Sequence, residues 1–319
     1  MKTKLLLIIL VLASTFSFAQ TKVADKFFDN YAYIKASELY EDAIKNGDDS
    51  AQVLLRLGDC YYNNSNSEKA AIWYKKALDK NVEEVSSDYI YKYIQTQRSL
   101  GKYDEAEAWL DIFKTRQTDD NRIYSKITDL STYLELSSMD NIYIDAKNLD
   151  LNTEYSDFGG YEFNGRMFFA STRNSKDATG NKIYSWNEQP FLDIFETTVK
   201  ETNGVKEYGT VMSLNADGIN TAYHESNIAI TNDGKTVYFT RDNLNRRNRL
   251  DSDNEGTTHL KILKASLDNG NWKDVEELTI NKDKYSTYSV RSLTTLHSYK
   301  LYHHSCIFII IYIYTNLYD

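Results

Sequence analysis

The segments ASELYEDA (Ala36–Ala43) and AAIWYKKA (Ala70–Ala77) carry alanine, tyrosine and alanine at the same three positions, 34 residues apart. Within each segment these residues follow the i, i+4, i+7 spacing of one helix face. A second match at the same offset lies upstream, where Ala24 and Phe27 recur as Gly58 and Tyr61. A repeat of this length predicts helix pairs that stack on one another and share a core.

The period and the residue types resemble the tetratricopeptide repeat, which implies a solenoid with a binding groove and a scaffold rather than a catalyst. We expect Gly58 and Ala70 where two helices cross closely. A third copy begins its second helix near Gly101 and Ala106, two residues late, and carries Gln97 in place of an aromatic residue. The predicted repeat-signature positions are Ala24, Phe27, Ala36, Tyr40, Ala43, Leu54, Leu57, Gly58, Tyr61, Ala70, Tyr74, Ala77, Gly101 and Ala106.

Helical spacing and stop signals divide the N-terminal part into helix pairs. Gly47 stands where a helix C-terminus favours glycine. A further apolar series in Asp120–Leu136 predicts a capping helix, which end repeats need to cover their apolar face. The predicted paired helices are Ala24–Tyr33, Ala36–Asn46, Ala51–Tyr62, Ser67–Lys80, Ser87–Leu100 and Tyr103–Thr115.

Residues 1–19 have the pattern of an export signal. Lys2 and Lys4 precede the apolar run Leu5–Leu12, and small residues at Ser17 and Ala19 form a cleavage site. The chain has 37 basic and 46 acidic residues and a net charge of −9. This balance does not suit a nucleic-acid partner, which needs a basic face, and it does not suit anionic lipid. The sequence therefore predicts an exported protein, periplasmic or associated with the outer membrane.

The two cysteines, Cys60 and Cys306, give little sign of a disulfide. Cys60 lies in a predicted repeat helix, where a small buried thiol is the ordinary case. Cys306 lies in a stretch of abnormal composition. A disulfide between them stays open as the less favoured alternative.

After Met139 the apolar period changes from helical to alternating, beginning with Ile142 and Ile144. Two hairpins are predicted, Tyr161–Ala170 around Asn164-Gly165 and Asn227–Thr240 around Asp233-Gly234. A later strand follows each hairpin, Leu192–Thr198 and Leu260–Ser266. Hairpins with following strands, repeated, are typical of propeller blades. The predicted blade-signature positions are Asp157, Gly165, Phe169, Asp233, Gly234, Tyr238, Phe239 and Arg241.

Ser156-Asp157-Phe158, His224–Asn227 and Tyr238–Arg241 resemble the WD-like propeller repeats of bacterial envelope proteins. An export signal, helical repeats and this propeller, in that order, resemble the front half of the OmpA-family envelope proteins of the Bacteroidetes type. The resemblance covers residues 1 to about 286. It implies a link to outer-membrane, secretion or gliding machinery, and peptidoglycan binding only through a domain missing from this chain.

Residues 287–319 depart from that pattern, because a third blade hairpin is expected and none follows. The stretch holds three of the five histidines and the apolar run Ile307–Ile313, which is too short to span a bilayer. We predict an aberrant, out-of-frame or disordered tail. The expected layout is α + β and multidomain. A signal peptide (1–19) precedes an all-α repeat solenoid (20–136), an incomplete all-β propeller-type domain (137–286) and the tail (287–319).

Two candidate sites each have an ordinary structural alternative. Asp251, Asp253 and Glu255 with Gly256 resemble the start of a calcium loop, but the twelfth position is Ile262 where calcium loops require glutamate. A solvated acidic loop is the competing interpretation. His224 and Glu225 lack a second histidine at ligand spacing, which favours a hydrogen bond that closes a blade.

No phosphate loop or nucleophile elbow is present. The sequence therefore predicts no cofactor, no catalytic residue and a non-enzymatic scaffold for proteins of the cell envelope. The alternative is a propeller-type hydrolase acting on peptides or glycans, which would need clustered acids or a Ser/His pair.

Overall fold

A computed structural model describes residues 20–118, 120–124, 148–173, 182–291 and 307–312. The predicted signal peptide, most of the predicted capping helix and the predicted strand at Ile142–Ile144 lie outside these residues. The chain forms two compact units. The helical unit is Met1–Ala146 with Ser185–Glu188, and the strand unit is Lys147–Tyr184 with Gln189–Asp319.

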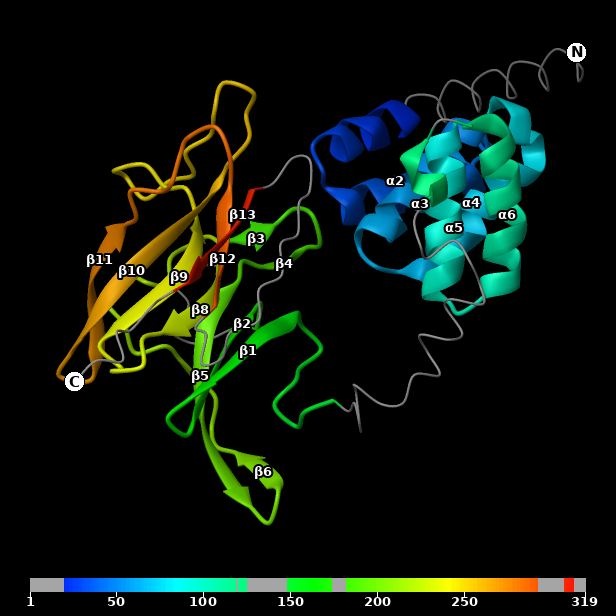
Figure 1. The fold of residues 1–319 in the computed structure, drawn as a ribbon. Coiled ribbons are helices and arrows are strands. Elements are labelled where there is room, and N and C mark those ends of the chain that lie inside the picture. The colour runs from blue at the N-terminus through cyan, green and yellow to red at the C-terminus, as the bar shows by residue number, and fades with distance from the viewer. Residues whose placement is uncertain (1–19, 119, 125–147, 174–181, 292–306, 313–319) are drawn as a thin grey trace, which may run out of the picture. The chain divides into compact units, whose positions relative to one another are not determined.

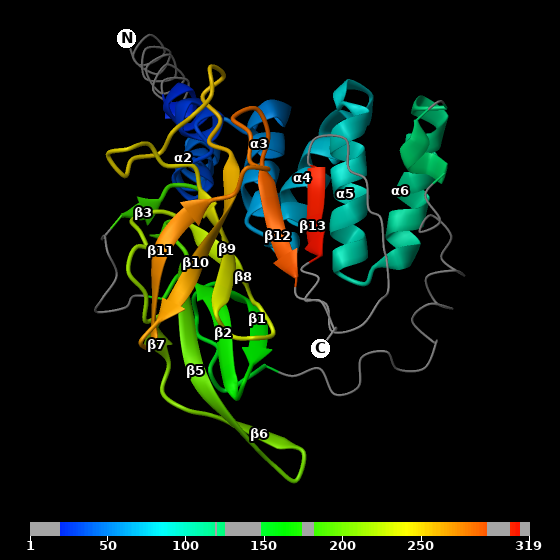
Figure 2. The ribbon, with the colours of Figure 1, turned by 60° about the vertical axis from the view of Figure 1, so that its left-hand side comes forward.

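The helical unit consists of antiparallel helix pairs, which Figures 1 and 2 show side by side. Residues 20–29 form the first helix. It is followed by α2 (Tyr33–Lys45), α3 (Ala51–Asn63), α4 (Ser67–Asn81), η1 (Val82–Glu84), α5 (Ser87–Ser99), α6 (Tyr103–Arg116) and η2 (Asn121–Tyr124). The described part of the predicted capping helix is the short 3₁₀ turn η2. No described helix is both long enough and apolar enough to cross a membrane.

The first helix of each pair ends in the same way, with one residue in the left-handed region: Tyr31 (φ 59°), Ser65 (φ 58°) or Gly101 (φ 69°). The next backbone N–H then bonds back to the carbonyl five residues earlier, which is the Schellman arrangement. Only the third copy uses glycine here. The predicted first helix, Ala24–Tyr33, therefore extends past the observed end at residue 29, because tyrosine at position 31 gives no sign of the left-handed conformation it adopts.

The core of the helical unit is built from the small and aromatic repeat positions. Tyr40 and Tyr74 are fully buried. Gly58 lies against Tyr74, since a Cβ at Gly58 would lie 2.5 Å from the Tyr74 ring. Glycine is needed at this position because the ring occupies the space of a side chain. Trp186 from Ser185–Glu188 also belongs to this unit, where its ring packs edge-on against Tyr33.

The strand unit contains two main antiparallel sheets, each built on a hairpin. The first sheet pairs β1 (Asp157–Phe163), β2 (Arg166–Ser171), β5 (Asp193–Thr202) and β6 (Val205–Tyr208), with β7 (Met212–Ser213) beside β5. The second sheet has the order β11-β10-β9-β8, from β8 (Glu225–Ile230), β9 (Thr236–Asp242), β10 (Leu260–Asp268) and β11 (Asn271–Glu277). Both predicted hairpins and both later strands are confirmed. In both views β5 and β6 extend together beyond the rest of their sheet.

A shared core lies between the two sheets. Phe168 and Ile194 from the first sheet cluster with Ile230, Val237 and Phe239 from the second. The described strands show neither a closed barrel nor a propeller, so the propeller stays a prediction. Two short pairs complete the unit: β3 (Ile183–Tyr184) with β4 (Gln189–Pro190), and β12 (Thr287–Arg291) with β13 (Ile307–Tyr312) in parallel. The latter pair falls within the predicted tail.

Candidate functional site

Asp25, Tyr40 and Arg56 meet where the first three helices pack together. The Tyr40 hydroxyl donates to Asp25 Oδ1 at 2.6 Å, and Arg56 Nη1 donates to the same oxygen at 2.8 Å. The Arg56 guanidinium lies 4.8 Å from the centre of the Phe28 ring, a distance suited to a cation–π contact. Burial raises the pKa of Tyr40, so this hydroxyl remains a proton donor.

The same arrangement recurs one repeat later. The Tyr74 hydroxyl and Lys92 Nζ both donate to Asp59 Oδ1 at 2.6 Å, and Lys92 Nζ lies 5.0 Å from the centre of the Tyr89 ring. Asp59 and Tyr74 each follow their counterparts by 34 residues, and Lys92 follows Arg56 by 36. The longer step matches the two residues inserted before Ala106.

The charged residues here and the rings beside them lie on the first helices of successive pairs. We define the first-helix face as Asp25, Phe28, Arg56, Asp59, Tyr89 and Lys92. The Arg56 side chain is 23% exposed and the Lys92 side chain 34%, while Asp29, which also pairs with Arg56 at 3.4 Å, is 62% exposed. Arg56 and Lys92 are partly exposed, so their remaining N–H donors can reach a bound peptide while Asp25 and Asp59 stay paired with them.

Sequence reasoning missed these charged positions, although a signal was present. Asp25 and Asp59 directly follow the repeat positions Ala24 and Gly58, so the carboxylate recurs at the same offset. The predicted signature residues have structural roles instead. Those that are nearly fully buried are Ala24, Ala36, Tyr40, Ala43, Leu54, Leu57, Ala70, Tyr74, Ala77 and Ala106. Phe27 and Tyr61 are half-buried.

Gln97 is a defect in the core of the third helix pair. It occupies the position of Phe27 and Tyr61, is 2% exposed, and its Oε1 has no hydrogen-bond partner among the described residues. A buried carbonyl without a partner costs about 1–3 kcal/mol. We expect Gln97→Met to stabilise the helical unit by about 1 kcal/mol, measured by urea unfolding. Gln95→Met is the control, because Gln95 is half-buried and donates to the Tyr91 hydroxyl at 2.7 Å. Equal destabilisation by both would contradict this account.

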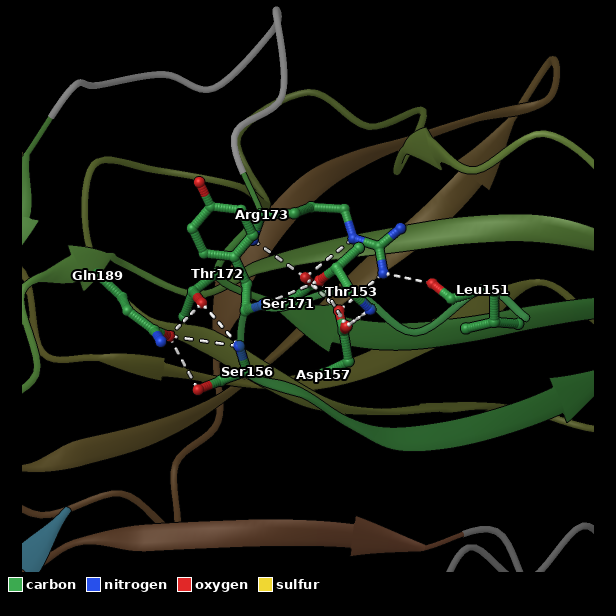
Figure 3. A network of polar contacts seen from close by, with 9 residues as sticks. Leu151, Thr153, Ser156, Asp157, Ser171, Thr172, Arg173 and Gln189 are labelled. Carbon is green, nitrogen blue, oxygen red and sulfur yellow. Dashed lines mark hydrogen bonds and ion pairs between the residues drawn. The ribbon is translucent and has the colours of Figure 1, made fainter. Parts of the chain in front are cut away.

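In the strand unit, a network of polar contacts surrounds Asp157 at the start of the first sheet (Figure 3). Asp157 Oδ1 accepts from Ser171 Oγ at 2.5 Å and from Arg173 Nη2 at 2.7 Å. Its Oδ2 accepts from the backbone N–H and the hydroxyl of Thr153 at 2.6 and 2.7 Å. Arg173 also donates to the Leu151 carbonyl at 2.9 Å. Although burial opposes it, these hydrogen bonds lower the pKa of Asp157. A carboxylate satisfied in this way is a structural anchor.

The second sheet begins with the same turn, 68 residues later. Glu225 accepts from the backbone N–H and the hydroxyl of Thr221 at 3.0 and 2.5 Å, as Asp157 does from Thr153. We name Thr153–Asp157 the first entry turn and Thr221–Glu225 the second entry turn. His224 Nδ1 accepts from the Leu192 N–H at 3.1 Å, which is the structural hydrogen bond expected for this histidine. The predicted pair His224 and Glu225 therefore belongs to the fold.

The remaining predicted positions are also structural. Gly165 and Gly234 have φ of 70°, as their hairpin turns require. Phe169 and Phe239 are buried. Asp233 accepts from the Lys235 N–H within its turn, Tyr238 packs beside the small cluster of Ala229 and Ile262, and Arg241 donates to the Gly218 carbonyl.

In the acidic loop predicted as a calcium candidate, the Asp253 carboxylate makes hydrogen bonds to other residues of the same loop. Asp253 Oδ1 accepts from the Glu255 and Thr257 backbone N–H groups at 2.9 Å, and Oδ2 lies 2.9 Å from His259 Nε2. The twelfth position, Ile262, is buried in β10. Within the described residues no group of three or more His, Cys, Asp or Glu side chains could hold a metal ion. Cys60 is a buried free thiol.

Comparison with known proteins identifies the helices. The tetratricopeptide repeat family model matches residues 33–83. Residues 33–83, which include α2, α3 and α4, are therefore similar to tetratricopeptide repeats. No curated protein matches the chain in sequence.

Solved structures match parts of this chain at low similarity. One is the C-terminal part of a TPR repeat-containing protein from Cytophaga hutchinsonii, at 20% identity and a TM-score of 0.33, over 37% of this chain and 45% of that one. Yeast Tom70 matches at 19% identity and a TM-score of 0.29, over 39% and 23%. The type III secretion translocator chaperone SycD of Yersinia enterocolitica matches at 16% identity and a TM-score of 0.29, over 38% and 89%. This chain thus spans less than half of the first two structures.

Proposed function

We propose that this protein is a non-enzymatic scaffold whose tetratricopeptide repeats bind a segment of a partner protein along the first-helix face. The observation that carries the proposal is that a cation paired with a carboxylate recurs one repeat later, and that an aromatic ring lies beside each of the two cations. Stacked repeats place equivalent residues in a row, and an extended or helical peptide can contact several of them at once.

The first-helix face favours a partner segment that carries both charged and apolar side chains. Arg56 and Lys92 supply N–H donors to a carboxylate or carbonyl of the partner, and Phe28 and Tyr89 supply apolar contact beside them. Aromatic and arginine side chains are enriched among the residues that dominate binding energy in protein interfaces.

We also propose that the scaffold acts in the bacterial envelope and that its strand unit is propeller-like. The export pattern of residues 1–19 supports the location. The two sheets that begin with matching entry turns support the propeller-type interpretation, because repeated sheets with equivalent closing contacts are the basis of that architecture. The link to OmpA-family proteins and to secretion or gliding machinery rests on the order of these modules.

Site-specific photo-crosslinking tests the proposal. A benzophenone amino acid replaces Asp29, which is 62% exposed beside Arg56, or Ile72, which is 52% exposed on a second helix. The full chain is incubated with envelope extract, and the crosslinked peptides are identified by mass spectrometry. We expect a defined partner segment at position 29 and none at position 72. The same products at both positions, or products at position 72 alone, would contradict a site on the first-helix face.

A further inference from the structure

The two entry turns share one geometry but differ in chemistry at one pair of residues. In the first, the Ser156 N–H donates to Thr172 Oγ1 at 3.1 Å, and the Thr172 N–H donates back to the Ser156 carbonyl at 3.0 Å. In the second, the His224 N–H donates to Asp242 Oδ2 at 3.2 Å, and the Asp242 N–H donates back at 3.0 Å. Two neutral hydroxyl side chains are thus replaced by an imidazole and a carboxyl group.

The imidazole is held in its neutral form. Its Nδ1 already accepts from the Leu192 N–H, so a proton at Nδ1 would remove that hydrogen bond. The ring lies between Tyr184, with centres 4.6 Å apart, and Phe191, with centres 4.5 Å apart. Neither ring offers a counter-ion for an imidazolium, and protonation would place a charge in a buried site.

Buried carboxyl groups from three strands lie around this histidine. Asp193 begins β5, Glu225 begins β8 and Asp242 ends β9; they are 6%, 0% and 9% exposed. Among the described residues none of the three forms an ion pair. The other charged or titratable groups here are Arg241 on β9, whose charge favours ionised Glu225, Tyr184 on β3, and Lys182, which lies against Tyr223.

We propose that the stability of the second entry turn against local opening depends on pH. The turn is more stable in mildly acidic solution than at neutral pH, whereas the stability of the first entry turn does not change over the same range. The matched pair in the same strand unit carries this proposal, since one turn has hydroxyl groups where the other has titratable groups. Ionisation in the second turn places negative charge on buried carboxyl groups that form no ion pair among the described residues.

The direction follows from how burial acts on each group. Burial raises the pKa of Asp193 and of Asp242 to about 6, and it raises the pKa of Glu225. A raised carboxyl pKa gives stability that is present at low pH and is lost as pH rises through about 6. Burial lowers the pKa of His224 to about 4, and its contribution is lost as pH falls from about 6.5 towards 4. The effect of three carboxyl groups outweighs that of one imidazole, so the second entry turn becomes more stable when the pH is lowered from 7.5 to 5.

Hydrogen exchange of the full chain at pH 5 and 7.5, corrected for intrinsic exchange rates, measures the amide protection of both entry turns in one sample. We expect the protection of the Glu225 and Asp242 amides to be about tenfold higher at pH 5. The Asp157 and Thr172 amides are expected to change by less than about twofold, because their turn is held by hydroxyl groups and the Asp157–Arg173 pair.

Substitution of the buried carboxyl groups distinguishes a pH effect that arises in the second entry turn from a general effect of pH on the protein. In the variant Asp193→Asn with Asp242→Asn, the amide oxygen can still accept from the His224 N–H, and the tenfold ratio is expected to fall below about threefold. An unchanged ratio in the Asn variant, equal ratios at the two turns in the native protein, or greater protection at pH 7.5 would overturn the proposal.

Discussion

Tyr74→Ala is expected to destabilise the helical unit by about 4 kcal/mol, since truncating a fully buried aromatic side chain costs about 3–5 kcal/mol. Tyr74 is 0% exposed, its ring fills the space opposite Gly58, and its hydroxyl donates to Asp59. The substitution therefore creates a cavity and removes a donor from a buried carboxylate. Urea unfolding followed by hydrogen exchange of helical-unit peptides measures the loss.

Tyr74→Phe separates packing from hydrogen bonding at the same position. The ring remains against Gly58, while Asp59 keeps Lys92 as a donor. We expect this variant to lose about 1 kcal/mol. A loss for Tyr74→Ala no larger than that for Tyr74→Phe would mean that the ring does not hold the helix pair together.

Arg173→Met is expected to destabilise the first sheet by about 3 kcal/mol, because removing one partner of a buried ion pair leaves an uncompensated charge. The side chains of Arg173 and Asp157 are 14% and 5% exposed. Methionine keeps much of the side-chain volume, so the loss reflects the charge and the donors that Figure 3 shows reaching Asp157 and Leu151. Hydrogen exchange of β1 and β2 under urea reports the effect.

Lys206→Met is the matched control for this variant. Lys206 pairs with Glu162 in the same unit, but their side chains are 40% and 38% exposed. Exposed pairs contribute about 0–1 kcal/mol, so this substitution should lower stability by less than 1 kcal/mol. Equal effects of the two substitutions would show that burial does not set the strength of the Arg173 pair.

The helix pairs and both hairpins were predictable because their signals are local. Alanine and tyrosine at helical spacing and Asn164-Gly165 with its positive φ angles act within a few residues. The outer strands β6 and β11 had the same signal in Asn203-Gly204 and Asn269-Gly270, whose φ angles are also positive. They were missed because their exposed faces carry charged residues rather than an apolar alternation.

The first-helix face was harder to predict from the sequence, because its contacts join residues from different helices. The pairing of Arg56 with Asp25 and of Lys92 with Asp59 spans 31 and 33 residues. Charge at these positions looks like an ordinary solvated helix face until the packing brings the partners together. The end of the first helix was misplaced for a similar reason, since the backbone at Tyr31 adopts a positive φ that its side chain does not favour.

Side-chain footprinting of the bound protein tests the central claim most directly. Once a crosslinked partner segment is identified, hydroxyl-radical oxidation of the full chain is compared with and without that peptide. We expect slower oxidation of Phe28 and Tyr89 on the first-helix face, and unchanged oxidation of Trp73 and Trp109, which lie on the second helices α4 and α6. Protection of Trp73 and Trp109 with no change at Phe28 and Tyr89 would contradict a binding site on the first helices.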